Sequence, residues 1–180
     1  MVYVFLANGF EEIEALTPVD VLRRGGVEVV TVGIGAKIVM SSHNIAVAAD
    51  IEDRELLDFD GTEAVVLPGG MPGTLNLEKS PLVKKAIAYC AENDKYIGAI
   101  CAAPSVLGHA GLLKGKKAVC FPSFEGELTG AEIYDDYVCR DGKIITAKGM
   151  GVSLEFGLEL LRAVRNESVS EKVRTSVQCR

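Results

Sequence analysis

One cysteine, Cys101, lies where an apolar run ends and a run of small residues begins, in the segment YIGAICAAPSVLGHAG (residues 96–111). The apolar run is typical of a buried strand, and the residues after it are typical of a helix that begins near Pro104. Small neighbours suit a nucleophile at the apex of a tight strand-to-helix turn, because the flanks of such a turn pack closely. Backbone N–H groups at a helix start favour a thiolate over a thiol. The sequence therefore predicts that Cys101 is reactive.

The other four cysteines lack such a turn. Cys90 falls late in a predicted helix, Cys120 and Cys139 fall in predicted strands, and Cys179 lies in the terminal tail. The five cysteines form no C-x-x-C pair, and an odd number without a secretory signal argues against a disulfide framework. We interpret these four as packing or surface residues of a reduced, cytoplasmic protein.

A hydrolytic Cys-His pair needs an imidazole beside the sulfur, and the chain holds two histidines. His109 follows Cys101 by eight residues in the same segment. That separation is about 12 Å along a helix axis, which is too far for a hydrogen bond to the sulfur. His43 lies in a predicted hairpin and reaches the cysteine only through tertiary folding or a neighbouring subunit. The small number and the positions of these histidines therefore disfavour protease or amidase chemistry.

Carboxyl groups are the alternative proton carriers. Glu11, Glu12 and Glu14 lie in or just after the first turn of the helix predicted from GFEEIEALTPVDVLRRGG (residues 9–26). Each acid also suits the positive end of a helix dipole without any further role. If one of them is buried beside a thiolate, repulsion and desolvation raise its pKa and leave an acid that can donate to sulfur. Spacing alone does not select among the three.

A glycine-rich turn, PGGMPG (residues 68–73), is a further candidate. Gly69 and Gly70 let the backbone approach a ligand closely, and the N–H groups of Gly70 and Ala102 together would stabilise an oxyanion. A turn that needs only positive φ would account for the same glycines.

The elements around these segments alternate between strand and helix. Helices are expected at 80–93 and 151–164 in addition to the first one, in which apolar residues recur every third position. These residues are Ile13, Leu16, Val19 and Leu22. Strands are expected at 2–7, 27–34, 64–67, 96–100, 116–121 and in a hairpin at 136–147, with a small accessory hairpin at 37–50. The pattern predicts one α/β domain over residues 1–180, a doubly wound and mostly parallel sheet between helices, with its site outside the carboxyl ends of the strands.

Composition narrows the classes of function. The chain has 19 Lys and Arg against 25 Asp and Glu, a net charge of −6, and no basic block that would neutralise a phosphate polymer. No apolar run approaches the roughly 18 residues that span a bilayer. The start of the chain lacks a basic region and a small-residue cleavage site. We expect a cytoplasmic protein that binds neither nucleic acid nor membrane.

Four motifs in order carry a family resemblance: GFEEIEALTPVDVLRRGG, AVVLPGGMPGTLNL, AICAAPSVL and TAKGMGVSLEFGLELL. Over nearly its full length the chain resembles the ThiJ/PfpI superfamily and, within it, the subfamily of the parkinsonism-associated deglycase (DJ-one). The resemblance implies a flavodoxin-like sandwich, a homodimer and an elbow cysteine that oxidises readily to sulfinate. It implies that Cys101 is the nucleophile, that Glu14 is the protonated acid beside it, and that Gly70 and Ala102 are the backbone donors.

The chain departs from this family at one position. Many members carry a histidine after the next strand, where VCFPSFEG (residues 119–126) has Phe121. Without that histidine, Glu14 must serve as both acid and base. The basic hairpin residue of the family corresponds to His43 here, which favours a place for His43 near the site. Gly69, Phe121 and His43 are accordingly expected around the pocket.

The activities of this family are glyoxalase without glutathione, removal of early glycation adducts, redox sensing and chaperone-like action. The favoured hypothesis is a cysteine-dependent enzyme for small dicarbonyls, in which Cys101 forms a hemithioacetal and Glu14 moves a proton between adjacent carbons. This chemistry requires no metal or cofactor. The alternative is a redox sensor or redox-regulated chaperone without turnover. A thiazole-biosynthesis enzyme or an intracellular protease rests on family names alone, and the missing Cys-His pair weighs against the protease.

Overall fold

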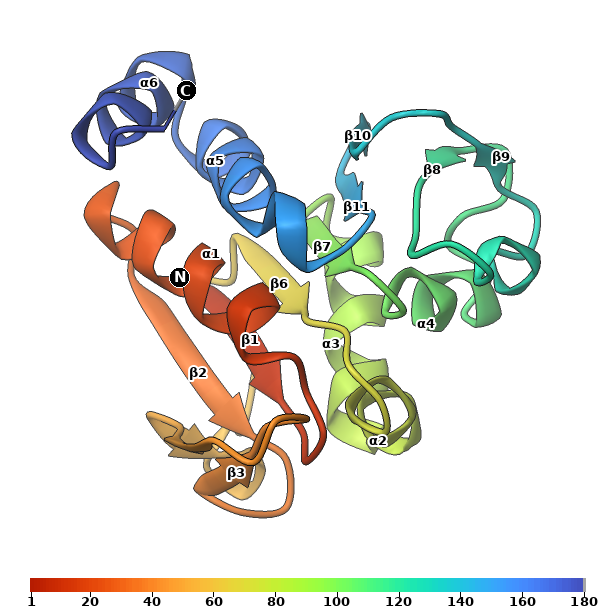
Figure 1. The fold of residues 1–180 in the computed structure, drawn as a ribbon. Helices are drawn as coiled ribbons and strands as arrows, with labels where there is room; N and C mark the ends of the chain where they lie inside the picture. Colours follow the sequence, from red (N-terminus) through yellow and green to blue (C-terminus); the bar gives the residue numbers. More distant parts are fainter. Residues whose placement is uncertain (180) are drawn as a thin grey trace.

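The computed structural model describes residues 1–179, which form a central sheet with the strand order β10-β11-β7-β6-β1-β2-β5 (Figure 1). Its strands are β1 (Val2–Leu6), β2 (Val29–Gly33), β5 (Ile51–Glu52), β6 (Ala64–Leu67), β7 (Tyr96–Ile100), β10 (Val138–Asp141) and β11 (Ile144–Ala147). Neighbours pair in parallel except β10, which is antiparallel to β11. The predicted mostly parallel α/β sheet is confirmed.

Helices cover both faces of this sheet, as the buried apolar strands require. Figure 1 shows α1, α5 and α6 on one side and α2, α3 and α4 on the other. Their bounds are α1 Glu12–Arg24, α2 Gly73–Lys79, α3 Pro81–Glu92, α4 Pro104–His109, α5 Ser153–Val164 and α6 Glu167–Ser176. Alternate residues of β1 supply the two cores: Val2 and Val4 pack in the cluster that contains α5, whereas Tyr3 and Phe5 pack in the one that contains α3.

The contact between α1 and α5 depends on a glycine. A Cβ at Gly157 of α5 would lie 3.2 Å from the Pro18 Cα, so a larger residue would push the helices apart. α1 continues through Pro18 as one helix. Only half of its predicted apolar stripe is buried: Val19 and Leu22 face the core, whereas Ile13 and Leu16 are 44% and 37% exposed.

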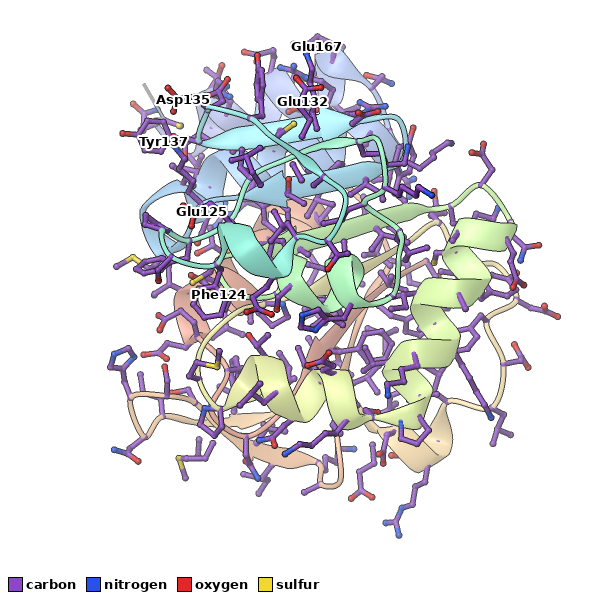
Figure 2. The ribbon with its side chains drawn as sticks, turned by 90° about the vertical axis from the view of Figure 1, so that its right-hand side faces the viewer. Phe124, Glu125, Glu132, Asp135, Tyr137 and Glu167 are labelled. Carbon is purple, nitrogen blue, oxygen red and sulfur yellow. The ribbon has the colours of Figure 1, made fainter. Side chains whose placement is uncertain are left out.

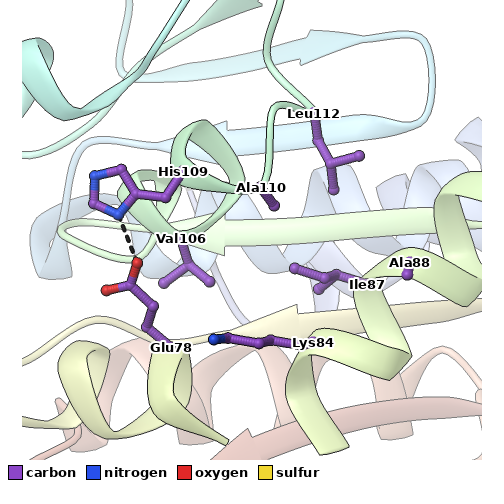
Figure 3. Close-up of a pocket in the computed structure, with 8 residues that line it drawn as sticks. All are labelled: Glu78, Lys84, Ile87, Ala88, Val106, His109, Ala110 and Leu112. Carbon is purple, nitrogen blue, oxygen red and sulfur yellow. Dashed lines mark hydrogen bonds and ion pairs between the residues drawn. The ribbon is translucent and has the colours of Figure 1, made fainter. Parts of the chain in front are cut away.

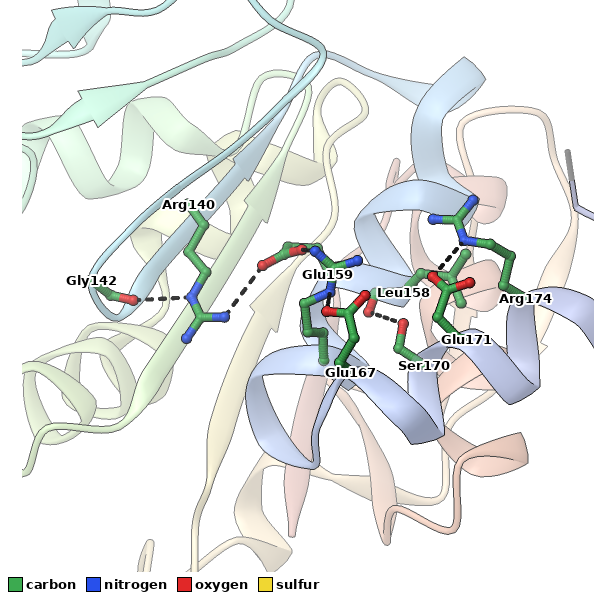
Figure 4. Close-up of polar contacts among 9 residues, drawn as sticks. Arg140, Gly142, Leu158, Glu159, Glu167, Ser170, Glu171 and Arg174 are labelled. Atoms are coloured by element: carbon green, nitrogen blue, oxygen red, sulfur yellow. Dashed lines mark hydrogen bonds and ion pairs between the residues drawn. The ribbon is translucent and has the colours of Figure 1, made fainter.

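The helix α6 follows α5 and docks against it, although no helix was expected in the terminal tail. The Ser170 hydroxyl of α6 donates a hydrogen bond of 2.9 Å to the carbonyl of Leu158 in α5. Figure 4 shows this contact beside the ion pair of 3.3 Å that joins Arg140 of β10 to Glu159 of α5. These contacts attach α6 to α5, and α5 to the edge strand β10.

The segment between α4 and β10 leaves the main sheet. Its short strands β8 (Lys117–Ala118) and β9 (Glu132–Ile133) pair only with each other, and a 3-10 turn at Glu125–Glu127 lies between them. Figure 2 faces this segment, with Phe124 and Tyr137 along the left of the view. The strand predicted at 116–121 is therefore wrong in length, since β8 covers Lys117–Ala118 alone, and Cys120 follows β8 rather than lying in a strand.

The predicted accessory hairpin is confirmed as the antiparallel pair β3 (Ile38–Met40) and β4 (Ala46–Ala48). It lies against the start of α1, because Gly9 N–H donates to the Met40 carbonyl and Ser42 N–H donates to the Phe10 carbonyl, both at 2.8 Å. Two further 3-10 turns span Asp53–Glu55 and Met150–Val152. Among residues 1–179, no helix has the length and apolar character needed to cross a membrane.

Candidate active site

Cys101 follows β7 directly and has a φ of +65°, a left-handed backbone that is costly for a residue with a side chain. Two hydrogen bonds of 2.8 Å hold this conformation: its N–H donates to the Ala147 carbonyl of β11, and its carbonyl accepts from Phe121 N–H. Pro104 opens α4 three residues later. This is the strained strand-to-helix turn that the small flanking residues predict.

Glu14 is the carboxyl group that meets the sulfur. Its side chain is 1% exposed, and its Oε2 accepts the Gly69 N–H at 2.9 Å. The Cys101 thiol and the Met150 N–H also donate hydrogen bonds to this carboxylate. The structure thus distinguishes Glu14 from the two neighbouring acids, which spacing alone did not separate.

Gly69 leaves room for this pair. A Cβ at position 69 would lie 2.6 Å from Glu14 Oε2 and 2.7 Å from Cys101 Cβ, closer than real Cβ contacts allow. The same turn is fixed against the start of α1, since Glu11 N–H donates to the Gly69 carbonyl at 2.9 Å. Any other residue at this position would displace the sulfur or the carboxylate.

The N–H groups of Gly70 and Ala102 both donate hydrogen bonds to the Cys101 sulfur. Gly70 has a φ of +90°, and a Cβ there would lie 2.5 Å from the Glu11 nitrogen, so this position requires glycine. The two donors that the sequence suggested are therefore brought together at the sulfur.

Burial dominates the electrostatics of the pair. It raises the pKa of Glu14 from 4.5 to about 7. Burial and the adjacent Glu14 charge raise the pKa of Cys101 to about 12, while the Ala102 and Gly70 N–H groups act in the opposite direction. The expectation that peptide dipoles hold Cys101 ionised is therefore wrong for this geometry, because desolvation and the carboxylate outweigh the two donors. Both pKa shifts favour the protonated forms of the two groups.

Phe121 and His43 lie on different sides of this centre. A Cβ at Gly149 would be 3.3 Å from the Phe121 ring and 3.8 Å from Glu14 Oε1, so the half-exposed ring and this carboxylate oxygen both lie beside Gly149. His43 is an exposed residue whose Nδ1 lies 3.0 Å from Glu12 Oε1. Among the contacts found in residues 1–179, none joins His43 to Cys101 or to Glu14.

A groove of about 430 Å³ adjoins the Phe121 side of the site and was not identified from the sequence. Met150 connects the groove to the Cys101 and Glu14 pair, because its N–H donates to Glu14 and the residue also lines the groove. The lining residues are Phe121, Pro122, Tyr137, Lys148, Gly149, Met150, Gly151 and Val152. Loops far apart in the sequence form this groove, so no local pattern could reveal it.

His109 ends α4 as predicted and belongs to another part of the molecule. Its ring nitrogens lie 2.6 Å from Glu78 and 2.8 Å from Glu127, and both carboxylates raise its pKa. Figure 3 shows its ring turned toward Glu78 in a cavity of about 370 Å³ that also includes Lys84 and Ile87.

Cys90, Cys101, Cys120 and Cys139 are thiols that form no disulfide in the described chain. Cys90, Cys120 and Cys139 are buried, and Cys179 is partly buried. Burial raises the pKa of Cys90 to about 12 and that of Cys120 to about 11. None of these three has hydrogen-bond donors aimed at its sulfur in the contacts of residues 1–179, which separates them from Cys101.

The fold and the elbow cysteine define a flavodoxin-like α/β protein with a Cys-Glu centre, and the sequence profile of the DJ-1/PfpI family matches residues 1–163. The chain belongs to the DJ-1/PfpI family. Its relatives belong to the DJ-1 branch of that family, as the resemblance implied. The solved structure of oxidized Toxoplasma gondii DJ-1 superposes with a TM-score of 0.94 at 33% identity, covering 99% of this chain and 97% of that one.

Two curated relatives extend this comparison. The chain is 37% identical to protein DJ-1 homolog B of Arabidopsis thaliana over 89% of its length, and it spans 37% of that longer protein. It is 30% identical, over 86% of its length and 82% of the relative, to a Caenorhabditis elegans protein named glutathione-independent glyoxalase DJR-1.2.

Proposed function

We propose that the protein is a glutathione-independent glyoxalase that converts small 2-oxoaldehydes into 2-hydroxy acids, with related action on early glycation adducts. The observation that carries this proposal is the Cys101 thiol hydrogen-bonded to a buried Glu14 whose pKa is about 7, with two N–H groups directed at the sulfur. The similarity to a relative named as such a glyoxalase supports the same reaction class.

The first step joins the thiol to the aldehyde. Glu14 accepts the S–H proton while sulfur bonds to the aldehyde carbon, and the electron pair of the C=O bond moves to oxygen. The N–H groups of Gly70 and Ala102 stabilise that oxyanion, which then takes the proton back from Glu14 to give a hemithioacetal. Proton transfer during the attack avoids a free thiolate, which the Cys101 pKa of about 12 makes costly.

The second step moves hydrogen between adjacent carbons. Glu14 removes the proton from the carbon bonded to sulfur to give an enediolate, the hydroxyl proton of that carbon moves to the neighbouring oxygen, and Glu14 returns its proton to the neighbouring carbon. That neighbour is reduced from ketone to alcohol while the first carbon is oxidised to a thioester. Water then hydrolyses the thioester, releasing the hydroxy acid and the Cys101 thiol. The overall change adds one water to the substrate and requires no external oxidant or reductant.

The surroundings of the pair suit a small substrate. Phe121 replaces the histidine of many relatives and carries no titratable proton, so Glu14 performs both transfers. The adjoining groove is largely apolar and holds one cation, Lys148. A methyl or hydrogen substituent of the substrate fits beside the Phe121 ring at this edge of the site.

The decisive measurement is the formation of lactate from methylglyoxal by the native protein, Cys101→Ala and Glu14→Gln. Cys179→Ala, which removes another partly exposed thiol, is the matched control. Both site variants should lose at least about 100-fold in turnover, and the control should keep the native rate. Equal rates in the native protein and Cys101→Ala would reject the proposal.

The second candidate is a redox sensor or redox-regulated chaperone, which the strained and partly exposed position of Cys101 favours over the three buried thiols. Mass spectrometry after mild peroxide separates the two functions. Sulfinate confined to Cys101, without dicarbonyl turnover, supports the sensor. Oxidation spread over all five cysteines contradicts both.

We also propose that the protein works as a cytoplasmic homodimer, as the family resemblance implies. The exposed Ile13 and Leu16 on α1 are candidates for the contact between subunits. Analytical ultracentrifugation should show a dimer in the native protein, and Leu16→Glu should shift it toward monomer.

A further inference from the structure

A second cluster of ligand-type side chains lies where the start of α1 meets the turn between β3 and β4. Glu11 and Glu12 each offer a carboxylate oxygen, His43 offers Nδ1, and the three atoms lie within 4.8 Å of one another. His43 Nδ1 is 3.0 Å from Glu12 Oε1 and 3.4 Å from Glu11 Oε2. Ligands at about 2.0–2.1 Å from a tetrahedral Zn²⁺ are roughly 3.3 Å apart, so these separations fit a shared ion.

The carboxylate of Glu12 has one buried oxygen that lacks a hydrogen-bond partner within residues 1–179, which is an independent indication of a ligand at this cluster. The residue is only 8% exposed, yet its Oε2 has no hydrogen-bond partner in the described structure. The other oxygen of this carboxylate faces His43. A buried carboxylate oxygen without a donor is costly, and a cation that Glu12 binds with both oxygens, beside His43, would remove that cost.

The surrounding contacts hold the ligands in place before any ion binds. The Ser42 hydroxyl donates to Glu11 Oε2 at 3.1 Å, and the Ser41 hydroxyl oxygen accepts the His43 N–H at 3.3 Å. The turn that carries His43 is fixed to α1 by the hydrogen bond from Ser42 N–H to the Phe10 carbonyl. Such outer contacts orient metal ligands and strengthen binding.

We propose that Glu11, Glu12 and His43 form a binding site for a divalent transition-metal ion of the Zn²⁺ class. One imidazole and two carboxylates match the ligand preferences of Zn²⁺ better than those of Mg²⁺ or Ca²⁺, which favour oxygen ligands alone. Three protein ligands leave a fourth position for water. The site is separate from the Cys101 and Glu14 pair and does not depend on the glyoxalase reaction.

His109 provides a matched control within the same chain. It also lies between two glutamates, but Glu78 contacts its Nδ1 and Glu127 contacts its Nε2. The two carboxylates are on opposite edges of the ring and cannot converge with it on one ion. A histidine between two carboxylates is therefore not enough to form a metal site. At His43 both carboxylates lie near the same ring nitrogen, Nδ1.

The test uses the Cys101→Ser protein, so that the reactive thiol cannot bind the metal. Zn²⁺ affinity is measured by competition with a chromophoric chelator, and Co²⁺ absorption reports the coordination. We expect one ion per chain, at least tenfold weaker binding after adding His43→Ala, and no change after adding His109→Ala. His43→Arg should also lose binding, because it keeps a positive charge beside both acids but has no lone pair to offer.

Three results would overturn the site: no stoichiometric binding in Cys101→Ser, equal affinity with and without His43, or an equal loss in His109→Ala. A thiolate charge-transfer band in the Co²⁺ spectrum would also overturn it, because it would assign the ion to a cysteine. His43 is 66% exposed in its side chain, so its replacement should leave the fold intact. Matched far-ultraviolet circular dichroism of the variants verifies this.

Discussion

The thiol of Cys101 donates a hydrogen bond to the buried carboxylate of Glu14, and each group changes the acidity of the other. The thiol lowers the pKa of Glu14, although burial keeps that pKa near 7. The carboxylate raises the pKa of the thiol. The raised pKa of Glu14 agrees in direction with the protonated acid that the family resemblance implied, and near pH 7 the group can also accept a proton.

Replacing Glu14 by glutamine should increase the reactivity of Cys101 while it abolishes turnover. The substitution removes the negative charge that helps to raise the thiol pKa, so the thiolate fraction at pH 7.5 should rise and iodoacetamide alkylation should accelerate at least about tenfold. Peptide mass spectrometry follows the modification, and Glu92→Gln, which changes an exposed acid at the end of α3, serves as the control. Slower alkylation in Glu14→Gln would mean instead that Glu14 acts as a donor to a thiolate.

The pH profile of the proposed glyoxalase activity should report Glu14. Only ionised Glu14 can accept the thiol proton, so kcat/KM should rise as pH increases through about 7, the pKa of this group. Initial rates of methylglyoxal consumption between pH 5.5 and 8.5 give the profile. A rate that falls over the same interval would identify protonated Glu14 as the active form.

The strands and the elbow were predictable because their signals are local. The apolar run of β7 and the small residues around Cys101 specify a buried strand followed by a tight turn. The same holds for α3, where Ser80 caps the first turn by accepting the Val83 N–H and Pro81 follows. These features depend on neighbours within a few residues.

The electrostatics and the groove depend on tertiary contacts and were not predictable in the same way. Helix position suggested an ionised Cys101, but burial and then the charge of Glu14, from a segment far away in the sequence, raise its pKa. The groove between Phe121 and Met150 and the cluster around His43 likewise join loops that are distant in the chain. The apolar spacing of α1 did not reveal that Ile13 and Leu16 remain exposed, because periodicity identifies a face without saying what covers it.

Stability should depend on pH through Glu14. Its pKa is raised from 4.5 to about 7 on folding, so the folded chain binds more protons than the unfolded chain between these values. The stabilising contribution is complete below about pH 4.5 and is lost as pH rises through 7. Relative to Glu14→Gln, the free energy of unfolding of the native protein should fall by about 2 kcal/mol between pH 5.5 and 8.

Urea titrations of both proteins at the two pH values, in reducing buffer, measure this difference. Other titrating groups are common to the pair and cancel in the comparison. A native protein that becomes more stable than Glu14→Gln as pH rises would show that Glu14 is already ionised in the folded state at low pH.

Gly69→Ala tests whether the sulfur and the carboxylate need the space between them. The added methyl would lie 2.6 Å from Glu14 Oε2 and 2.7 Å from Cys101 Cβ, so one of the two groups must move. We expect the free energy of unfolding to fall by roughly 1–3 kcal/mol and turnover to fall by at least tenfold, since small displacements of reacting groups are costly. Gly126→Ala is the control, because a Cβ there meets no atom within 4 Å and its φ is not left-handed. If Gly69→Ala retains native turnover, the close approach of Cys101 to Glu14 is not required for catalysis.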